Sequence, residues 1–262
     1  CPLPRRSAFP RMRRIPWTRN RFWIFPTLRV GVTFACISTW VNPIPRPSGK
    51  KAEPRNWTIC GAAEHRPPLR KCVPWAGASR RQLGVLGPDC HVAHGVYMTA
   101  DDRRRLRSRN TAVALCPRSN RVIGLDAPPV AAYLNEGNLL AVGTDSLSSS
   151  PSLDVMEDVA LLYKIARAQG YGEGDLARRL LHTATLGGAV ALGLSTGPQR
   201  VGQLQSGAVA DMVFFDVPVT TIVDTIEELV QTGASRQIAT IIDGNLRWVD
   251  PRFADIFERD VQ

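Results

Sequence analysis

Residues 139–154, LLAVGTDSLSSSPSLD, begin as an apolar run, reach an acid and continue as small polar residues. The run over 139–145 is short and almost wholly apolar, which is typical of a strand buried on both faces. Ser150 and Pro151 predict the start of a long helix, because serine is a preferred N-cap and proline suits the first turn. One face of that helix would carry the apolar residues Val155, Met156, Val159, Leu162 and Ala166. The stretch therefore predicts a strand followed by a helix, with Asp145 at the end of the strand.

The same alternation occurs upstream. The runs CHVAHG (90–95) and TAVALCP (111–117) predict two more apolar strands. Thr99 is a candidate N-cap for a helix after the first strand, and PPVAAYLNEG (128–137) predicts a helix that ends at a glycine. Apolar strands that alternate with amphipathic helices favour an α/β fold with a parallel sheet and helical crossovers.

The segment after the third strand contains two further kinds of element. DLARRLLHTATLGGAVALGL (175–194) predicts helices whose paired glycines permit close packing. GQLQSGAVADMVFFDVP (202–218) and ATIIDGNLRWV (239–249) predict short strands, and the second would fold into a hairpin at Asp243–Gly244. A small β element is therefore expected at the C-terminal end.

Polar residues follow each of the three predicted parallel strands. His94, the stretch CPRSN (116–120) and Asp145 all come just after a strand, at the end of the sheet where α/β barrels place their chemistry. Within CPRSN, the side chains of Arg118, Ser119 and Asn120 would either line a substrate pocket or cap the helix that follows. His91 is expected to pack on the opposite side of its strand, and His182 on the packed face of a helix.

The first 82 residues differ in composition from the rest. They contain 17 Lys and Arg against two acidic residues, and 12 of the 20 prolines, whereas the remaining 180 residues carry a net charge of about −5. This composition predicts an irregular segment, disordered or read from the wrong frame. A nucleic-acid-binding role for this basic segment is an alternative, but its frequent prolines interrupt any regular basic face, so no nucleic acid is expected as a partner.

Targeting and cysteine usage point to the cytoplasm. The apolar stretch 30–41 is too short to span a bilayer, so no membrane association is expected. The six cysteines form neither a CxxC pair nor a zinc-ribbon spacing, which favours a reducing compartment.

Five motifs occur in one order: HVAHGVYMTADD, ALCPRSN, AVGTDSLSSSPSLD, HTATLGGAVALGL and GQLQSGAVADMVFFD. In that order they resemble the C-terminal part of the amidohydrolase superfamily, in the branch of S-adenosylhomocysteine, aminodeoxyfutalosine and related aminopurine deaminases and chlorohydrolase-like enzymes. The resemblance covers about residues 83–262. It implies a partial (β/α)8 TIM-type barrel, about the last three βα units, over 83–197, and part of a small β-sandwich over 198–262, with 1–82 outside it.

The resemblance also implies a reaction. In such enzymes a single divalent metal, usually zinc, activates a water that attacks a ring carbon of a cyclic amidine or aminopurine-like small molecule, and ammonia leaves. The equivalent of Asp145 binds the metal and takes the proton of the water. The equivalent of His94 stabilises the attacking water and the tetrahedral centre.

The sequence departs from the family pattern at the other metal ligands. The family has an HxH pair after the first strand and a histidine in an HxxE arrangement after the fifth, but this chain has only four histidines and no HxH. In GAAEH (61–65), Gly61 stands at the ligand position and Glu64 at the position of the glutamate. A lone carboxylate does not hold zinc well, so the chain is expected not to retain the metal.

These departures leave two readings of function. The chain is expected to be a truncated or frame-disrupted fragment of a metal-dependent deaminase or hydrolase, of doubtful activity. The alternative is a non-catalytic half-barrel that is a remnant or a partner of a complete subunit. In both cases open strand edges favour association, including a homo-oligomer.

Overall fold

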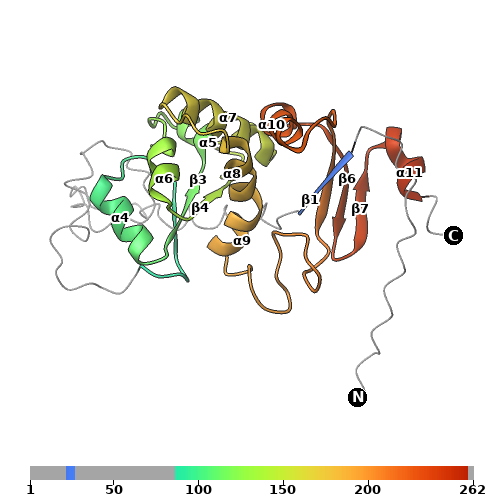
Figure 1. The fold of residues 1–262 in the computed structure, drawn as a ribbon, viewed down its shortest axis with the longest axis horizontal. Helices are drawn as coiled ribbons and strands as arrows, with labels where there is room; N and C mark the ends of the chain where they lie inside the picture. Colours follow the sequence, from blue (N-terminus) through green and yellow to red (C-terminus); the bar gives the residue numbers. More distant parts are fainter. Residues whose placement is uncertain (1–21, 27–85, 259–262) are drawn as a thin grey trace, which may run out of the picture.

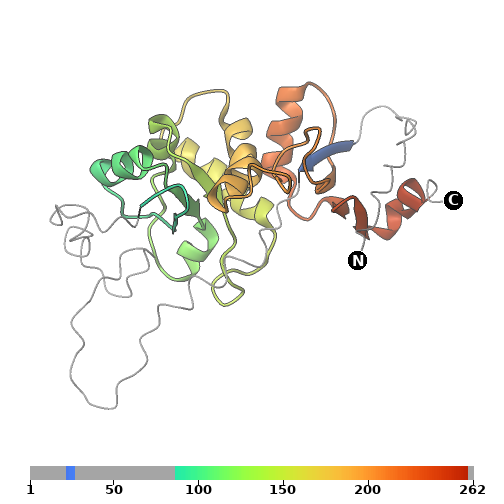
Figure 2. The same ribbon diagram turned by 90° about the horizontal axis from the view of Figure 1, so that it is seen from below.

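The computed structural model describes residues 22–26 and 86–258, which form two sheets and the helices around them (Figure 1). The three-stranded sheet has the order β2-β3-β4, and the four-stranded sheet the order β1-β5-β6-β7. Figures 1 and 2 both place the two sheets on opposite sides of α10. The strands are β1 (Phe22–Pro26), β2 (His91–Ala93), β3 (Ala112–Leu115), β4 (Leu140–Val142), β5 (Met212–Asp216), β6 (Gln237–Ile242) and β7 (Asn245–Val249). The helices are α4 (Ala100–Ser108), α5 (Pro117–Val122), α6 (Val130–Glu136), α7 (Val155–Ala168), α8 (Leu176–His182), η3 (Thr183–Gly187), α9 (Gly188–Ala191), α10 (Ile222–Thr232), η4 (Pro251–Phe253) and α11 (Ala254–Glu258).

The smaller sheet is parallel, which confirms the predicted α/β class. β2 pairs with β3 and β3 with β4, both in parallel register. All four residues of β3 and all three of β4 are buried, as expected for strands covered on both faces. β4 ends at Val142, so two further residues separate the strand from Asp145, where the sequence predicted that the strand would reach the acid.

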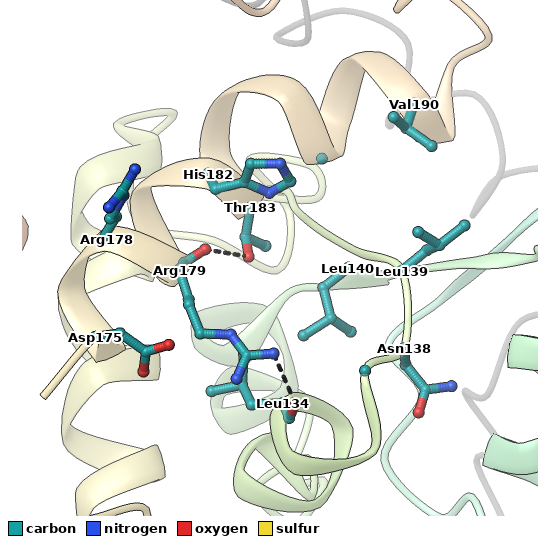
Figure 3. Close-up of a pocket in the computed structure, with 12 residues that line it drawn as sticks. Leu134, Asn138, Leu139, Leu140, Asp175, Arg178, Arg179, His182, Thr183 and Val190 are labelled. Atoms are coloured by element: carbon teal, nitrogen blue, oxygen red, sulfur yellow. Dashed lines mark hydrogen bonds between the residues drawn. The ribbon is translucent and has the colours of Figure 1, made fainter. Parts of the chain in front are cut away.

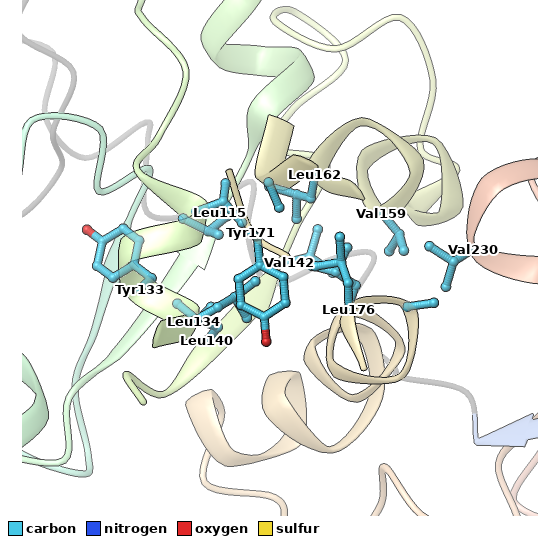
Figure 4. Close-up of a cluster of buried hydrophobic side chains, with 14 of the residues drawn as sticks. Leu115, Tyr133, Leu134, Leu140, Val142, Val159, Leu162, Tyr171, Leu176 and Val230 are labelled. Atoms are coloured by element: carbon cyan, nitrogen blue, oxygen red, sulfur yellow. The ribbon is translucent and has the colours of Figure 1, made fainter. Parts of the chain in front are cut away.

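The two faces of this sheet carry side chains of different size. Val113 and Leu115 of β3 belong to the main core, and Ala112 and Ala114 to a smaller cluster on the other face, which follows from the period of two along a strand. Figure 4 shows the main core, where side chains of β3 and β4 meet those of α6, α7 and α8. The smaller cluster includes Ala191 of α9 and Leu192. Helices therefore cover both faces of the parallel sheet.

Helix starts agree with the sequence at α4 and differ at α7. Thr99 caps α4 in a capping box with Asp102, as predicted from its position. α7 starts at Val155, because the side chain of Asp154 accepts a hydrogen bond from the backbone N–H of Met156. The prediction that Ser150 and Pro151 open this helix is wrong, since both lie in the preceding loop.

The stretch 175–194 forms α8, η3 and α9 without a break. Its middle part, η3, is a π-helical segment that packs against β4. A side chain at Gly187 would collide with the carbonyl oxygen of Leu140, so glycine permits the close approach of helix and strand that the paired glycines predicted.

The C-terminal region confirms the hairpin and adds two helices that the sequence did not predict. β6 and β7 pair antiparallel around Asp243 and Gly244, which both have positive φ (52° and 72°), as a tight hairpin turn requires. α10 and α11 were missed. Thr221 caps α10 by accepting from the backbone of Asp224, and this helix packs on α7 and α8.

The prediction that the N-terminal third is irregular is wrong at one place. Phe22–Pro26 forms β1, which pairs antiparallel with β5. The chain therefore builds its four-stranded sheet from an early segment and the C-terminal region, and Pro26 lies at the end of an edge strand, where a missing N–H is tolerated. Within the described residues, no helix is both long and apolar enough to cross a membrane.

Candidate active site

His94 and Asp145 lie just beyond the C-terminal ends of β2 and β4, in an unusual backbone conformation. Their φ angles are 66° and 61°, in the left-handed region that few residues other than glycine adopt. The backbone N–H of His94 donates to the carbonyl of Ala114 at 2.8 Å, which holds this turn against β3. Such strained positions cluster at functional sites.

The two side chains meet at the end of the sheet. His94 Nε2 lies 3.7 Å from Asp145 Oδ2, and the side chains are 5% and 9% exposed. This distance is too long for a direct hydrogen bond. The structure therefore brings together the two residues predicted to be catalytic and leaves a short gap between their polar atoms.

Three donors hold the carboxylate of Asp145. Oδ2 accepts from the hydroxyl of Ser119 at 2.7 Å and from that of Ser149 at 3.2 Å, while Oδ1 accepts from the backbone N–H of Ser146 at 2.8 Å. These three hydrogen bonds fix the orientation of the carboxylate.

Asn120 contacts the other side of the His94 ring. Its Oδ1 lies 2.7 Å from His94 Nδ1. Asn120 is 1% exposed, and its Nδ2 has no hydrogen-bond partner among the described residues. The imidazole is thus fixed by an amide on one side and faces a carboxylate on the other.

Arg118 points away from this pair of residues. Its guanidinium makes an ion pair with Asp158 at 2.8 Å and another with Glu157, and it donates to the carbonyls of Ser152 and Asp154 at 3.0 Å. Burial raises the pKa of Asp158, and the Arg118 hydrogen bonds oppose that rise. Arg118 therefore joins the start of α5 to the start of α7.

Gly95, which follows His94, is in contact with Tyr133. The Tyr133 hydroxyl donates to the carbonyl of Gly95 at 2.7 Å. A side chain on Gly95 would come within 2.6 Å of Val113 and 2.7 Å of the Tyr133 hydroxyl. The turn that presents His94 therefore requires glycine at the next position.

Cys116 is also near this end of the sheet but is not a nucleophile. It is fully buried at the end of β3. Burial, with smaller contributions from the charges of Asp145 and Asp158, raises the pKa of its thiol well above the usual range. A thiol that stays protonated does not attack a substrate.

The described residues do not by themselves form a zinc site. Structural and catalytic zinc sites have three or four protein ligands, whereas no group of three His, Cys, Asp or Glu side chains suitable for a metal occurs in the described part of the chain. Asp145 and His94 provide two candidate groups, and both carboxylate oxygens of Asp145 already accept hydrogen bonds.

A cavity of about 440 Å³ lies at the opposite end of β4 (Figure 3). It is lined by Asn138 and Leu139, which precede β4, and by His182 of α8. The predicted packing of His182 is wrong, because the side chain is exposed at the cavity. The five predicted site residues are absent from the lining.

The sequence did not identify two of the groups that hold Asp145. Ser146 and Ser149 follow Asp145 closely in a run of small polar residues. The spacing of that run did not indicate which serines donate to the Asp145 carboxylate. The contact between Asn120 and His94 joins residues 26 positions apart, and only the parallel pairing of β2 with β3 brings them together.

Comparison of the chain with known proteins identifies its family. The profile of the amidohydrolase family matches residues 61–247. Among relatives, the chain is 34% identical over 169 residues to a 5-methylthioadenosine/S-adenosylhomocysteine deaminase of Halobacterium salinarum, covering 63% of this chain and 38% of that protein. It is 33% identical over 186 residues to a 5'-deoxyadenosine deaminase of Methanosarcina mazei, covering 68% and 41%.

Solved structures agree. An adenosine deaminase from Xanthomonas campestris with bound zinc matches with a TM-score of 0.56 and 26% identity, over 63% of this chain and 38% of that one. The guanine deaminase of E. coli matches with a TM-score of 0.56 and 25% identity, over 64% and 41%. The chain thus spans about two fifths of the length of these proteins. On the profile match, the chain belongs to the amidohydrolase family, in the branch whose relatives are named deaminases.

Proposed function

We propose that this chain provides the C-terminal part of the active site of a hydrolytic deaminase that acts on an aminopurine nucleoside or a similar cyclic amidine. The observation that carries the proposal is the 3.7 Å approach of His94 to an Asp145 carboxylate held by three donors. The substrate class is supported by the names of the relatives, which are deaminases of methylthioadenosine, S-adenosylhomocysteine and 5'-deoxyadenosine.

In the proposed reaction, water adds to the ring carbon that bears the amino group. Asp145 takes a proton from the attacking water as general base, and the proton is delivered to the amine, which leaves as ammonia. His94, whose Nε2 lies 3.7 Å from Asp145 Oδ2, orients the same water. The orientation of the two groups before substrate arrives removes much of the entropic cost of aligning them.

Asp145 is the proposed metal ligand within the described residues. The HxH pair of the family is absent from the sequence, so this chain does not supply the full ligand set implied by the resemblance. The zinc reported with the adenosine deaminase of Xanthomonas campestris belongs to that protein.

The test is ammonia release by the full chain, purified with zinc supplied, from 5'-deoxyadenosine and S-adenosylhomocysteine. Release by the native chain, with a loss of about 100-fold or more in Asp145→Asn, would support the proposal, because a positioned general base contributes about 10²–10⁴-fold. His182→Gln, at the far end of β4, is the matched control and should retain full activity. No release from the native chain, or full activity in Asp145→Asn, would contradict the proposal.

A second candidate is a non-catalytic half-barrel that associates with a complete subunit. It is favoured by the absence of an HxH motif from the sequence and of a three-ligand cluster from the described residues. Zinc titration separates the two candidates: an active site binds one equivalent and a half-barrel binds none.

The domain organisation belongs to the same proposal. We infer that 83–197 is the last part of a (β/α)8 barrel and that 198–262 completes a small β-sandwich with β1. Apart from β1, the segment 1–82 that was predicted to be irregular lies outside the described residues, and the family profile begins within it, at residue 61. The unpaired edge strands of a partial barrel favour a homo-oligomer. Size-exclusion chromatography with light scattering would detect one. The free thiols of Cys90 and Cys116 suit a cytoplasmic location.

A further inference from the structure

Three consecutive residues at the start of α5 are all buried and each binds a different part of the molecule. Arg118, Ser119 and Asn120 are 8%, 0% and 1% exposed. Arg118 is bound to Asp158 of α7, Ser119 donates to Asp145, and Asn120 contacts the ring of His94. This tripeptide, 118–120, therefore touches both proposed catalytic groups and anchors them to a helix.

The contacts of Arg118 and Ser119 leave little capacity to bind a substrate. The guanidinium of Arg118 is engaged by two carboxylates and two carbonyls. The hydroxyl of Ser119 is within 2.9 Å of Ser149 in addition to its bond to Asp145. Residues that line a pocket for substrate would present polar atoms to it, so the contacts favour a positioning role over substrate binding.

The position of the ring proton of His94 follows from its two neighbours. A neutral imidazole carries one N–H and one acceptor nitrogen, and the hydrogen bond at one nitrogen selects the tautomer. Nδ1 lies 2.7 Å from Asn120 Oδ1, whereas Nε2 lies 3.7 Å from Asp145 Oδ2, which is beyond hydrogen-bond distance. A proton on Nδ1 is therefore satisfied within the described residues, and a proton on Nε2 is not.

We infer that Asn120 is a positioning residue that holds His94 in the Nδ1–H tautomer, so that the Nε2 lone pair faces the carboxylate of Asp145. Ser119 orients that carboxylate by donating a hydrogen bond to it. The ion pair of Arg118 with Asp158 fixes the tripeptide 118–120, which makes the contacts with His94 and with Asp145. This inference rests on the proposed function for the roles of His94 and Asp145.

The consequence is a pair of acceptors that face one gap. Nε2 and the Asp145 carboxylate can each accept one hydrogen of the same water molecule, which orients its oxygen lone pairs away from both. A ring with its proton on Nε2 would instead donate to Asp145 and leave the water with one acceptor. The tautomer thus decides whether the site orients a water or closes into a direct contact between the two side chains.

The test is the protonation state of each ring nitrogen of His94, read from long-range ¹H–¹⁵N correlation spectra of the ¹⁵N-labelled full chain in mildly alkaline buffer. His94→Gln assigns the signals. We expect a protonated Nδ1 and a bare Nε2 in the native chain. Asn120→Asp keeps an oxygen acceptor in place and should keep Nδ1 protonated, whereas Asn120→Leu removes it and should move the ring toward the Nε2–H form.

Asn138→Leu is the matched control, because Asn138 is also a buried amide with one unpaired atom but lies at the other end of β4. It should leave the His94 signals unchanged. A bare Nδ1 in the native chain, or an unchanged tautomer in a folded Asn120→Leu, would overturn the inference, and the native spectrum and Asn120→Asp decide the matter if Asn120→Leu does not fold. No substrate is needed, so a failed ammonia assay and a failed tautomer test are separate results.

Discussion

The two ends of strand β4 are built in opposite ways. At the C-terminal end, Asp145 and His94 are nearly buried, sit in left-handed backbone and are held by named hydrogen bonds. At the N-terminal end lies the cavity of about 440 Å³, where His182 is exposed and Arg179 donates to the carbonyl of Leu134. At the cavity, Arg179 and Asp175 are bound to Tyr171, whereas at the C-terminal end His94 and Asp145 face each other across a short gap.

Under the proposed function, the chemistry therefore lies away from the cavity. Reactive groups need fixed orientation, which requires buried hydrogen bonds around them. The side chains that make these hydrogen bonds occupy the space around them. In the described residues, His94 and Asp145 therefore lie at the C-terminal end of β4, which is more closely packed than the cavity end. The family membership of the chain points to the same end, because α/β barrels place their active sites at the C-terminal ends of the strands.

The largest expected effect compares two ion pairs, one near each end of β4. Arg118 and Asp158 are 10% and 0% exposed, whereas Arg103 and Glu136 are 12% and 28% exposed. Asp158→Ala leaves a buried guanidinium with less compensation, so we expect it to lower the free energy of unfolding by about 3 kcal/mol or more. Glu136→Ala should lower it by about 1 kcal/mol. Urea unfolding measures both, and equal losses would remove the contrast in packing between the ends.

The next effect compares two glycines with positive φ. A methyl group added at Gly95, which follows His94, would lie within 2.7 Å of two side chains, whereas one added at Gly137, before β4, would meet nothing within 4 Å. Gly95→Ala adds a clash to backbone strain, and we expect a loss of about 3 kcal/mol. Gly137→Ala adds strain alone, about 1 kcal/mol. Thermal unfolding of the two variants tests this, and a Gly137→Ala as damaging as Gly95→Ala would refute it.

A smaller effect compares two buried hydroxyls. Ser119 donates to the Asp145 carboxylate at 2.7 Å, and Thr183 of η3, beside the cavity, donates to the carbonyl of Arg179 at 2.9 Å. Bonds to charged groups are the stronger kind, so Ser119→Ala should destabilise the fold by about 2 kcal/mol and Thr183→Val by about 1 kcal/mol. Denaturant midpoints give both values. The reverse order would mean that Asp145 does not depend on its serine donors.

The smallest effect is a pH dependence of stability from His91, at the N-terminal end of β2. Burial lowers the pKa of His91 below its ordinary value of 6.5, against an opposing hydrogen bond with the backbone of Ala191. Below about pH 6.5 the unfolded chain binds a proton that the folded chain does not, so stability is present above that pH and is lost as the pH falls through the folded pKa.

We therefore expect the unfolding midpoint to fall as the pH is lowered from neutrality, and His91→Asn to flatten that fall. The pKa of His182 is also lowered, first by partial desolvation of its ring and then by the charge of Arg179. Because much of the His182 side chain remains in contact with water, His182→Gln should flatten the curve less. An unchanged slope in His91→Asn would show that its burial does not control the titration.

The sequence predicted the parallel sheet well because its signals are local. The apolar runs of β2, β3 and β4 and the cap at Thr99 depend on near neighbours in the chain. α10 was missed because it follows a strand in a region read as β, and β1 because Phe22–Pro26 is stabilised by pairing with β5, nearly 190 positions away. The sequence around Phe22–Pro26 did not indicate that this segment pairs with β5.

The site divides in the same way. The positions of His94 and Asp145 after apolar strands were predictable, since strand ends can be read from the sequence. The contacts of Asn120 with His94 and of Ser119 with Asp145 each span 26 residues. They depend on strand register and on a short helix, α5, that the sequence did not separate from the strand before it.

We propose that the reactive end of this chain is the C-terminal end of β4 and not the cavity. The most direct test is titration of the ¹⁵N-labelled full chain with 5'-deoxyadenosine while the ring signals of His94 and His182 are followed together. We predict that the His94 signals shift with saturation and that those of His182 stay fixed. Saturable shifts at His182 with none at His94 would place the ligand in the cavity and refute this proposal.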